Sequence, residues 1–506
     1  MPIVRSEKTY KDVYSYKDRV PSENHTGTNK FAGKWLENDV QELTMNEGKS
    51  AFHHEHGQLI NNSYKVLQRF AMLYESQEFC DIQLIVGQQV HFAHKLILCQ
   101  SSKVFLVMLR SPMWPESQGN QVLLKEEPEC CQVFGQFLRY LYTGVIQLTH
   151  DNVLPLLILG DKYFIADLSQ ICVNYMCEHI VSDINHNRAV SWYRYAVLKE
   201  DKRLAGTCKD FITWNFHKVL STVQYLQMEA DELIQFLRSS ELVIPDEYTL
   251  FSCIKNWIFQ RQHLDCVKYT NTALDIMSWI RFPMIQSNQL VSMQSDPIVA
   301  IHEEFFMEKI SNALNYHSYP KEIRNHMDLP SNLFCPDAFK PRNYTNDFWG
   351  TTFYVEHFHS LQNYSVQTLM FFTPVSGSET DEETTWEWAV DVYPKGVLFP
   401  KCLMIGWTQN YEIEGAAYDT VRLAIMSKST EHRAVEIVLL VTGVQDNIEF
   451  TKNVVKKRMV FDEDDNVYNV NDIVPYVELN DCRSSYLSGV DGDVFKITLI
   501  IKPCCE

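Results

Sequence analysis

Residues 79–109 read FCDIQLIVGQQVHFAHKLILCQSSKVFLVML, and this stretch decides the fold of the first half of the chain. Apolar residues recur at every second position over 82–86, and Gly87 precedes a second short extended run at 90–92. This alternation around a glycine predicts a β-hairpin. The remainder of the stretch, 93–109, is too apolar to face water on all sides, so we expect helices packed against the hairpin.

A second informative stretch, FGQFLRYLYTGVIQL, follows at 134–148. Together the two stretches resemble the BTB/POZ domain, in which Cys-Asp-x-x-Leu-x-Val leads to Phe-x-Ala-His-Lys-x-x-Leu and later to Phe-x-x-x-Leu-x-Tyr-x-Tyr-Thr-Gly. The residues that carry the resemblance are, in chain order, Cys80, Asp81, Leu84, Val86, Phe92, Ala93, His94, Lys95, Leu98, Phe134, Leu138, Tyr140, Tyr142, Thr143 and Gly144. The family implies dimerisation and recruitment of protein partners, which is the role of an interaction module and not of an enzyme.

From Asn185 the chain has the pattern of a helical array, with apolar residues at helical spacing as far as Leu220. The segment 232–261, ELIQFLRSSELVIPDEYTLFSCIKNWIFQR, resembles the BACK domain that commonly follows a BTB domain. The matching residues are Leu233, Phe236, Leu237, Ser240, Leu242, Val243, Glu247, Leu250, Phe251 and Trp257. Burial of each large apolar side chain contributes about 1.5 to 3 kcal/mol, so these residues indicate a stable stalk before they indicate a binding function.

The final block of the chain changes from a helical period to an alternating one. Trp386, Trp388 and Val390 occupy every second position, and a similar alternation recurs over 495–501. Several such strands at short spacing predict an antiparallel β-sandwich. The segment 386–399, WEWAVDVYPKGVLF, resembles the strand and turn of TRAF-like or MATH domains.

The predicted organisation is that of a multidomain α+β protein. We expect a disordered N-terminal tail at 1–56, an α/β BTB/POZ domain at 57–182, an all-α BACK helical domain at 183–318, a linker at 319–345 and a TRAF-like antiparallel β-sandwich at 346–506. This order resembles that of BTB–BACK proteins with a C-terminal TRAF-like domain.

One loop of the BTB segment, SPMWPESQGNQVLLKEE at 111–127, is a candidate cullin-3 contact. In BTB proteins that serve as cullin-3 adaptors this loop carries a hydrophobic residue, any residue and then Glu, and Trp114, Pro115 and Glu116 match that spacing. An aromatic anchor beside a carboxylate suits a binding hot spot, whereas the alternative is that Trp114 packs onto its own domain. Tyr142 would lie near the same surface in the family, or would be an ordinary core tyrosine.

The resemblance also implies a homodimer interface. Residues 59–73 have the spacing of an amphipathic helix that includes Leu67 and Phe70, and they resemble the leading helix that BTB dimers pack across their interface. Asp81 and Lys95 correspond to a charged pair at the base of the dimer groove in some BTB proteins. A partly buried pair of this kind would contribute specificity more than stability.

The sequence predicts no enzyme activity, no cofactor and no metal site. It contains neither a Gly-rich phosphate loop nor a nucleophile elbow, and His94 is expected to be a hydrogen-bonded core imidazole. The 14 cysteines include no C-x-x-C pair, so we expect reduced thiols. His53, His54 and His56 invite a metal assignment, but a flexible polar linker fits their surroundings better.

Charge and hydropathy argue against two classes of partner, nucleic acid and the membrane interior. A net charge of −19 argues against nucleic acid, which requires a concentrated basic face, and no apolar run approaches the roughly 20 residues that a membrane span needs. The charged N-terminus lacks the apolar core of a signal peptide, so a cytoplasmic or nuclear location is expected. Secretion is expected only if a signal is missing from this version. The N-x-S/T sequons, which matter only in that case, are at Asn24, Asn61, Asn343 and Asn363.

The leading hypothesis is a homodimeric BTB–BACK adaptor that recruits an unknown protein substrate, through its C-terminal domain, to a cullin-3 RING ubiquitin ligase. The alternative is an oligomeric scaffold that works without cullin-3, or a secreted galectin-binding-like glycoprotein.

Overall fold

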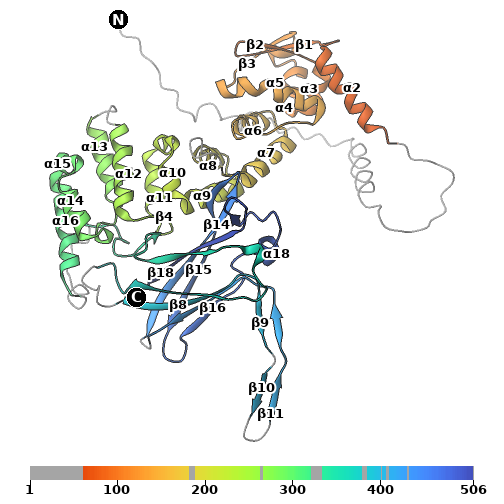
Figure 1. The fold of residues 1–506 in the computed structure, drawn as a ribbon. Helices are drawn as coiled ribbons and strands as arrows, with labels where there is room; N and C mark the ends of the chain where they lie inside the picture. The colour runs from red at the N-terminus through yellow and green to blue at the C-terminus, as the bar shows by residue number, and fades with distance from the viewer. Residues whose placement is uncertain are drawn as a thin grey trace, which may run out of the picture. The chain divides into compact units, whose positions relative to one another are not determined.

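The computed structural model describes residues 61–181, 188–261, 266–320, 333–378, 385–400, 402–405, 410–429 and 432–504 (Figure 1). The chain divides into a unit at 1–66 and a larger unit at 67–506, and apart from the first four residues of α2 (Ser63–Ser76) the domains below belong to the larger one. The predicted disordered tail at 1–56 lies outside the described residues.

The first domain has the predicted hairpin at its centre. Strand β1 (Ile82–Val86) pairs antiparallel with β2 (Gln89–Ala93) and parallel with β3 (Gln121–Leu124), which gives the sheet order β2-β1-β3. Gly87 has a φ of +60°, the left-handed conformation that a tight turn requires and that glycine adopts without strain. The helices of this domain are α2 (Ser63–Ser76), α3 (Lys95–Ser101), α4 (Lys103–Arg110), α5 (Pro128–Thr143), α6 (Val153–Lys162) and α7 (Ala166–Glu178).

The second domain is a helical array, as its apolar spacing predicts. Its helices are α8 (Ala189–Leu198), α9 (Lys202–Trp214), α10 (Phe216–Leu220), α11 (Ala230–Leu237), α12 (Glu247–Gln260), α13 (Cys266–Met277), α14 (Ser287–Met293), α15 (Pro297–Ile301) and α16 (Glu303–Ser318). Aspartates cap three of them: carboxylate oxygens of Asp201, Asp246 and Asp296 accept from the N–H groups of Leu204 (3.0 Å), Thr249 (2.7 Å) and Ile298 (3.1 Å). These caps satisfy backbone donors that a helix start leaves open.

The third domain is an antiparallel sandwich of two sheets. The first, which we call the junction sheet, has the order β15-β14-β18-β17, with β6 also paired to β18; the second, the outer sheet, has the order β16-β13-β8-β7. Two smaller ribbons pair β9 with β12 and β10 with β11. The elements are β6 (Gly350–Val355), β7 (Gln367–Pro374), β8 (Thr385–Tyr393), β9 (Val397–Phe399), β10 (Cys402–Ile405), β11 (Asn410–Ile413), β12 (Ala416–Tyr418), β13 (Arg422–Ser427), β14 (Arg433–Gln445), β15 (Ile448–Phe461), β16 (Val467–Val470), α18 (Tyr476–Leu479), β17 (Leu487–Ser488) and β18 (Val494–Pro503).

The junction sheet is buried on both faces. Val435, Ile437 and Leu439 of β14 belong to the core inside the sandwich, whereas Val438 and Leu440 belong to the apolar cluster that contains the helices of the second domain. Because alternate residues of a strand point to opposite faces, the junction sheet contributes side chains both to the core of the sandwich and to the core of the helical domain. The outer sheet packs on the junction sheet with one face, and its other face does not contribute to the core shared with the helical domain.

The end of the predicted linker at 319–345 is buried. Strand β5 (Asn343–Tyr344) pairs in parallel with β4 (Val243–Ile244) of the helical domain, and Arg342 and Asn343 have no exposed surface. The residues that lead into the sandwich are therefore packed into the core of the helical domain. Within the described residues no helix has the length and hydropathy of a membrane span.

Candidate functional site

The predicted cullin loop forms a short ordered turn between α4 and β3. Residues Pro115–Ser117 make one turn of 3₁₀-helix, and the main-chain N–H of Trp114 donates to the carbonyl of Ser111 (3.1 Å). The hydroxyl of Ser117 donates to the carbonyl of Trp114 (2.8 Å). These contacts hold the backbone of the loop while Met113 remains 91% exposed. A rigid turn that carries exposed apolar side chains loses little entropy when a partner binds.

Trp114 and Glu116 each combine a buried and an accessible part. Both side chains are partly buried, and Pro115 between them is exposed. Oε2 of Glu116 is enclosed by protein and has no hydrogen-bond partner among the described residues. A carboxylate oxygen in this condition carries a desolvation cost that a donor would relieve. Trp114 is thus partly buried and partly accessible, and its role as a binding anchor stays a prediction.

Tyr142 does not lie on a binding surface. It is 5% exposed, and its hydroxyl accepts from the main-chain N–H of His94 (2.9 Å) and lies 2.8 Å from Nδ1 of His94. Nε2 of His94 donates to the carbonyl of Glu78 (2.8 Å), so Nδ1 of the neutral ring accepts the tyrosine proton. Burial raises the pKa of Tyr142 to about 12. The core alternative therefore holds for Tyr142, and the predicted structural role of His94 is confirmed.

Helix α2 exposes the residues predicted for a dimer interface. None of its residues is buried, and Leu67 and Phe70 are 51% and 37% exposed. The helix is seated through Tyr74, whose hydroxyl donates to the carbonyl of Gly135 (3.0 Å) and whose ring lies 5.3 Å from that of Tyr142. One side of α2 thus contacts the domain, and the other presents apolar side chains to solvent.

Asp81 and Lys95 are adjacent but do not form the predicted partly buried charge pair. A carboxylate oxygen of Asp81 accepts from the main-chain N–H of Lys95 (2.7 Å), while the Lys95 ammonium donates to the carbonyl of Gly119 (3.1 Å). Asp81 is exposed. The carboxylate of Asp81 helps to position the start of α3, and the ammonium of Lys95 joins that helix to the loop 111–127. Each side chain thus interacts with main-chain atoms.

The outer sheet has an unusual solvent-side face. The strand register places Met370, Ala389, Met426 and Val467 side by side across its four strands, on the face opposite the sandwich core. Met370 and Val467 are 53% and 43% exposed. An antiparallel sheet with one solvated face normally carries polar residues there. We call these four residues the apolar row.

Carboxylates flank the apolar row. Glu387 and Asp391 lie on β8, two residues to either side of Ala389, and both are partly exposed. The hydroxyl of Thr368 donates to Asp391 (2.5 Å). The turn 462–465, which contains four acidic residues, precedes β16 at the end of the sheet nearest Glu387. The face therefore combines an apolar stripe with negative charge.

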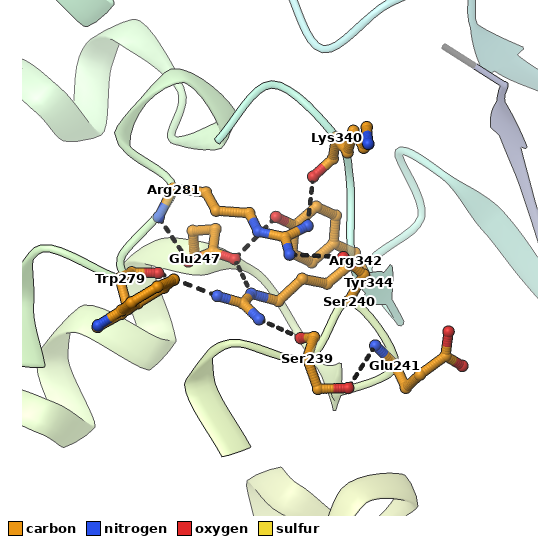
Figure 2. A network of polar contacts seen from close by, with 9 residues as sticks. All are labelled: Ser239, Ser240, Glu241, Glu247, Trp279, Arg281, Lys340, Arg342 and Tyr344. Carbon is orange, nitrogen blue, oxygen red and sulfur yellow. Dashed lines mark hydrogen bonds and ion pairs between the residues drawn. The ribbon is translucent and has the colours of Figure 1, made fainter. Parts of the chain in front are cut away.

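Sequence reasoning missed a buried polar network between the helical domain and the sandwich, which Figure 2 shows. At its centre Glu247 pairs with Arg342 (2.6 Å between Oε1 and Nε), and both side chains are 0% exposed. The hydroxyl of Tyr344 donates to the same oxygen (2.9 Å), and the main-chain N–H of Arg281 donates to Oε2 (3.2 Å). Burial raises the pKa of Tyr344 well above its usual value.

The two guanidiniums of this network also bind main-chain carbonyls. Arg342 donates to Trp279 (3.0 Å) and to Ser239, and Arg281 donates to the carbonyl of Lys340 (2.6 Å). Burial, and then the neighbouring Arg342, lower the pKa of Arg281. Glu247 was identifiable from the sequence only as part of the BACK pattern, and nothing near it indicated its partners. The network is structural, because the side chains of Glu247 and Arg342 have no exposed surface.

Two further observations bear on chemistry and modification. Among the described residues no cluster of three or more His, Cys, Asp or Glu side chains is arranged to hold a metal ion, and none of the 11 cysteines whose side chains the structure describes is in a disulfide bond. Of the sequons, Asn343 is 0% exposed, and its amide donates to the carbonyl of Glu241 (2.9 Å) and accepts from Lys502 (2.9 Å). A glycan on Asn343 is incompatible with this fold. Asn61 and Asn363 are exposed, and Asn24 lies outside the described residues.

Comparisons with known families agree with this architecture. Family models match the BTB/POZ domain at 70–180, the BACK domain, described as BTB And C-terminal Kelch, at 189–295, and the BTBD17 TRAF domain at 339–505. The chain thus carries BTB/POZ, BACK and TRAF domains in that order. The last match begins within the predicted linker, close to the buried Arg342.

The chain also resembles curated proteins. It is 26% identical to BTB/POZ domain-containing protein 17 of Xenopus laevis, over 65% of this chain and 67% of that protein, and 29% identical to the Homo sapiens protein of the same name, over 65% and 66%. It is 24% identical to Galectin-3-binding protein of Rattus norvegicus, over 76% of this chain and 63% of that protein. The matches span about two thirds of each relative.

Proposed function

We propose that this BTB–BACK–TRAF chain is a homodimeric adaptor that holds a protein substrate on its TRAF domain and brings it to a cullin-3 ubiquitin ligase. BTB and BACK domains are protein-interaction modules and commonly occur together in cullin-3 substrate adaptors. In this proposal the chain performs no chemistry itself, and the ligase supplies the catalytic step.

Dimerisation is supported by the exposed side of α2. Leu67 and Phe70 expose large apolar surfaces on a helix that has no buried residue. Leu96 on α3 is likewise 76% exposed. A twofold interface uses the same patch on both copies, so a second α2 would cover this surface with its own counterpart.

The observation that carries the adaptor role is the state of the cullin loop. Met113 and Trp114 offer apolar surface on a rigid turn, and the enclosed oxygen of Glu116 has no donor within the described part of the chain. A partner helix that supplies a donor to Glu116 and covers the two apolar side chains would satisfy all three residues at once. This combination of an aromatic anchor and a satisfied polar group is typical of binding hot spots.

The apolar row of the outer sheet is the candidate substrate surface. Methionine side chains adapt to differently shaped apolar partners, and Met370 and Met426 both lie in this row. The carboxylates of Glu387 and Asp391 on either side favour a substrate segment in which an apolar residue is flanked by Lys or Arg.

Co-precipitation with cullin-3 tests the proposal. We expect the wild-type chain to bind cullin-3 and the double variant Trp114→Ala/Glu116→Ala to lose most of that binding. Gln118→Ala is the matched control, since Gln118 is an exposed residue of the same loop, and it should bind as the wild type does. Absence of cullin-3 from the wild-type precipitate would refute the adaptor role.

The similarity to galectin-3-binding proteins favours a second candidate, an oligomeric or secreted scaffold that works without cullin-3. That candidate predicts a secreted chain with glycans at the exposed Asn61 or Asn363. A chain that remains in the cytoplasm and carries no glycan would exclude the secreted form.

A further inference from the structure

The turn between β14 and β15 is a sharp two-residue tip. Asp446 and Asn447 have φ angles of +51° and +64°, as in the type I′ turns that join the two strands of a hairpin. Gln445 and Ile448 are the paired residues on either side of the tip. The tip therefore projects Gln445 from a fixed backbone.

Gln445 binds the main chain where the BTB domain ends. Its amide Nε2 donates to the carbonyl of Glu178 (2.6 Å) and lies 3.3 Å from Nδ1 of His179, and its Oε1 accepts from the N–H of Val181 (3.3 Å). The last carbonyls of a helix have no partner within that helix, and α7 ends at Glu178. One TRAF side chain thus supplies both a donor and an acceptor to the final described residues before the BACK domain.

The BACK domain holds the same hairpin along the edge of β15. The side chain of Asn215 accepts from the N–H of Thr451 (2.7 Å) and donates to its carbonyl (3.1 Å), which imitates the pairing of a neighbouring strand. Lys218 donates to the carbonyl of Glu449, and the rings of Phe211 and Phe450 lie 6.1 Å apart. The hairpin is therefore fixed to BACK independently of the contact that Gln445 makes with 178–181.

His150 of the BTB domain contacts the other side of the same main chain. Its Nε2 lies 3.0 Å from the carbonyl of His179 and 3.1 Å from that of Val181. Its ring is stacked on that of Trp192 in α8, with 6.0 Å between centroids and 2° between planes. The segment 178–181 is consequently held by His150 of the BTB domain and Gln445 of the TRAF domain, and His150 is in turn stacked on a BACK residue.

We propose that the β14–β15 hairpin is a latch that fixes the joint between the BTB and BACK domains. The contact of Gln445 with 178–181 couples the TRAF domain directly to the BTB domain, so that the three domains move as one body. Without the latch the BTB domain is joined to BACK through the His150–Trp192 stack and through side-chain contacts of BACK residues with Asp151, Asp161 and Asn174. The latch adds the TRAF domain to this joint. The latch does not depend on cullin-3 or on any substrate, and it adds a conformational role to a strand pair of the TRAF domain.

Hydrogen–deuterium exchange of the full-length chain, read by mass spectrometry, tests the latch. In Gln445→Ala we expect the peptide that contains 178–181 to exchange about two- to tenfold faster, because the N–H of Val181 loses its acceptor. The double variant Gln445→Ala/Asn215→Ala should also accelerate the peptide that contains Thr451. Peptides of β1 should be unchanged, which shows that the BTB core remains folded.

The matched control is Gln170→Ala, an exposed glutamine of α7 whose amide donates to Asn174 on the same helix. It should leave the exchange of 178–181 unchanged. Small-angle scattering provides a second measurement, in which the double variant should have a larger radius of gyration than the wild type. Unchanged exchange at 178–181 in Gln445→Ala, or an unchanged radius of gyration in the double variant, would overturn the latch.

Discussion

Arg342 and Glu247 form an ion pair in which neither side chain has any exposed surface, with 2.6 Å between Nε and Oε1. Arg342 lies just before the sandwich, and Glu247 is in α12 of the BACK domain. Buried ions are stabilised only when their partners and hydrogen bonds are complete, and here Tyr344 and several main-chain groups complete them. This pair makes the start of the TRAF domain a part of the BACK core.

Removal of the arginine should therefore destabilise the chain strongly. We expect Arg342→Ala to lower the free energy of unfolding by about 3 to 5 kcal/mol, because Glu247 would remain as a buried charge that has lost its ion-pair partner. Chemical denaturation of the full chain measures this. Lys340→Ala, two residues away and with an exposed side chain, should cost less than about 1 kcal/mol. Equal effects of the two substitutions would contradict the role of the pair.

Gly350 should tolerate no side chain. A Cβ at this position would lie 1.9 Å from the carbonyl oxygen of Leu499 on the paired strand β18, and that backbone has no free direction in which to move. We expect Gly350→Ala to lower the melting temperature markedly. Gly206→Ala in α9, where a Cβ would have nothing within 4 Å, should instead stabilise by about 0.5 to 1 kcal/mol. Calorimetry of both variants measures these changes in melting temperature. An unchanged melting temperature in Gly350→Ala would mean that β6 does not pair with β18 as described.

A charge on the exposed side of α2 should weaken the dimer. We expect Leu67→Asp/Phe70→Asp to shift the chain toward monomer in sedimentation equilibrium, because two copies of the new charges would meet across a twofold interface. Val477→Asp is the control, since Val477 is 81% exposed in the TRAF domain. If the wild type is already monomeric at micromolar concentration, the assignment of α2 to a dimer interface is wrong.

Acid should destabilise the junction sheet through Glu436, which lies beside Lys456 and Lys502. Burial opposes the charge of Glu436, but Lys502 and Lys456 outweigh it and hold its pKa below the usual range. A carboxylate with a lowered pKa contributes stability at neutral pH, and this contribution is lost as the pH falls through the pKa of the folded state. Unfolding measured from pH 7 to about pH 3 should show less acid sensitivity in Glu436→Gln than in the wild type. Glu414→Gln, at an exposed position, should behave as the wild type does.

The sequence predicted the features that depend on local periodicity. The alternation over 82–86 and at Trp386 and Trp388 predicted strands, and the structure has them. His94, which no second candidate ligand accompanies in the sequence, is a hydrogen-bonded core imidazole. The sequence could not predict contacts between distant segments, because periodicity carries no information about them: Arg342 meets a carboxylate 95 residues away. The pairing of Asp81 with the ammonium of Lys95 is implied by the resemblance alone, and in the structure the carboxylate accepts from the main-chain N–H of Lys95 instead.

Sedimentation velocity of the purified chain mixed with purified cullin-3 tests the adaptor role most directly. The account predicts one complex that contains two copies of the chain and two of cullin-3, and predicts that Trp114→Ala/Glu116→Ala leaves the dimer intact and the cullin-3 unbound. Cullin-3 that sediments at its own rate in the presence of about 10 μM wild-type chain, a concentration at which a micromolar complex would form, would contradict it.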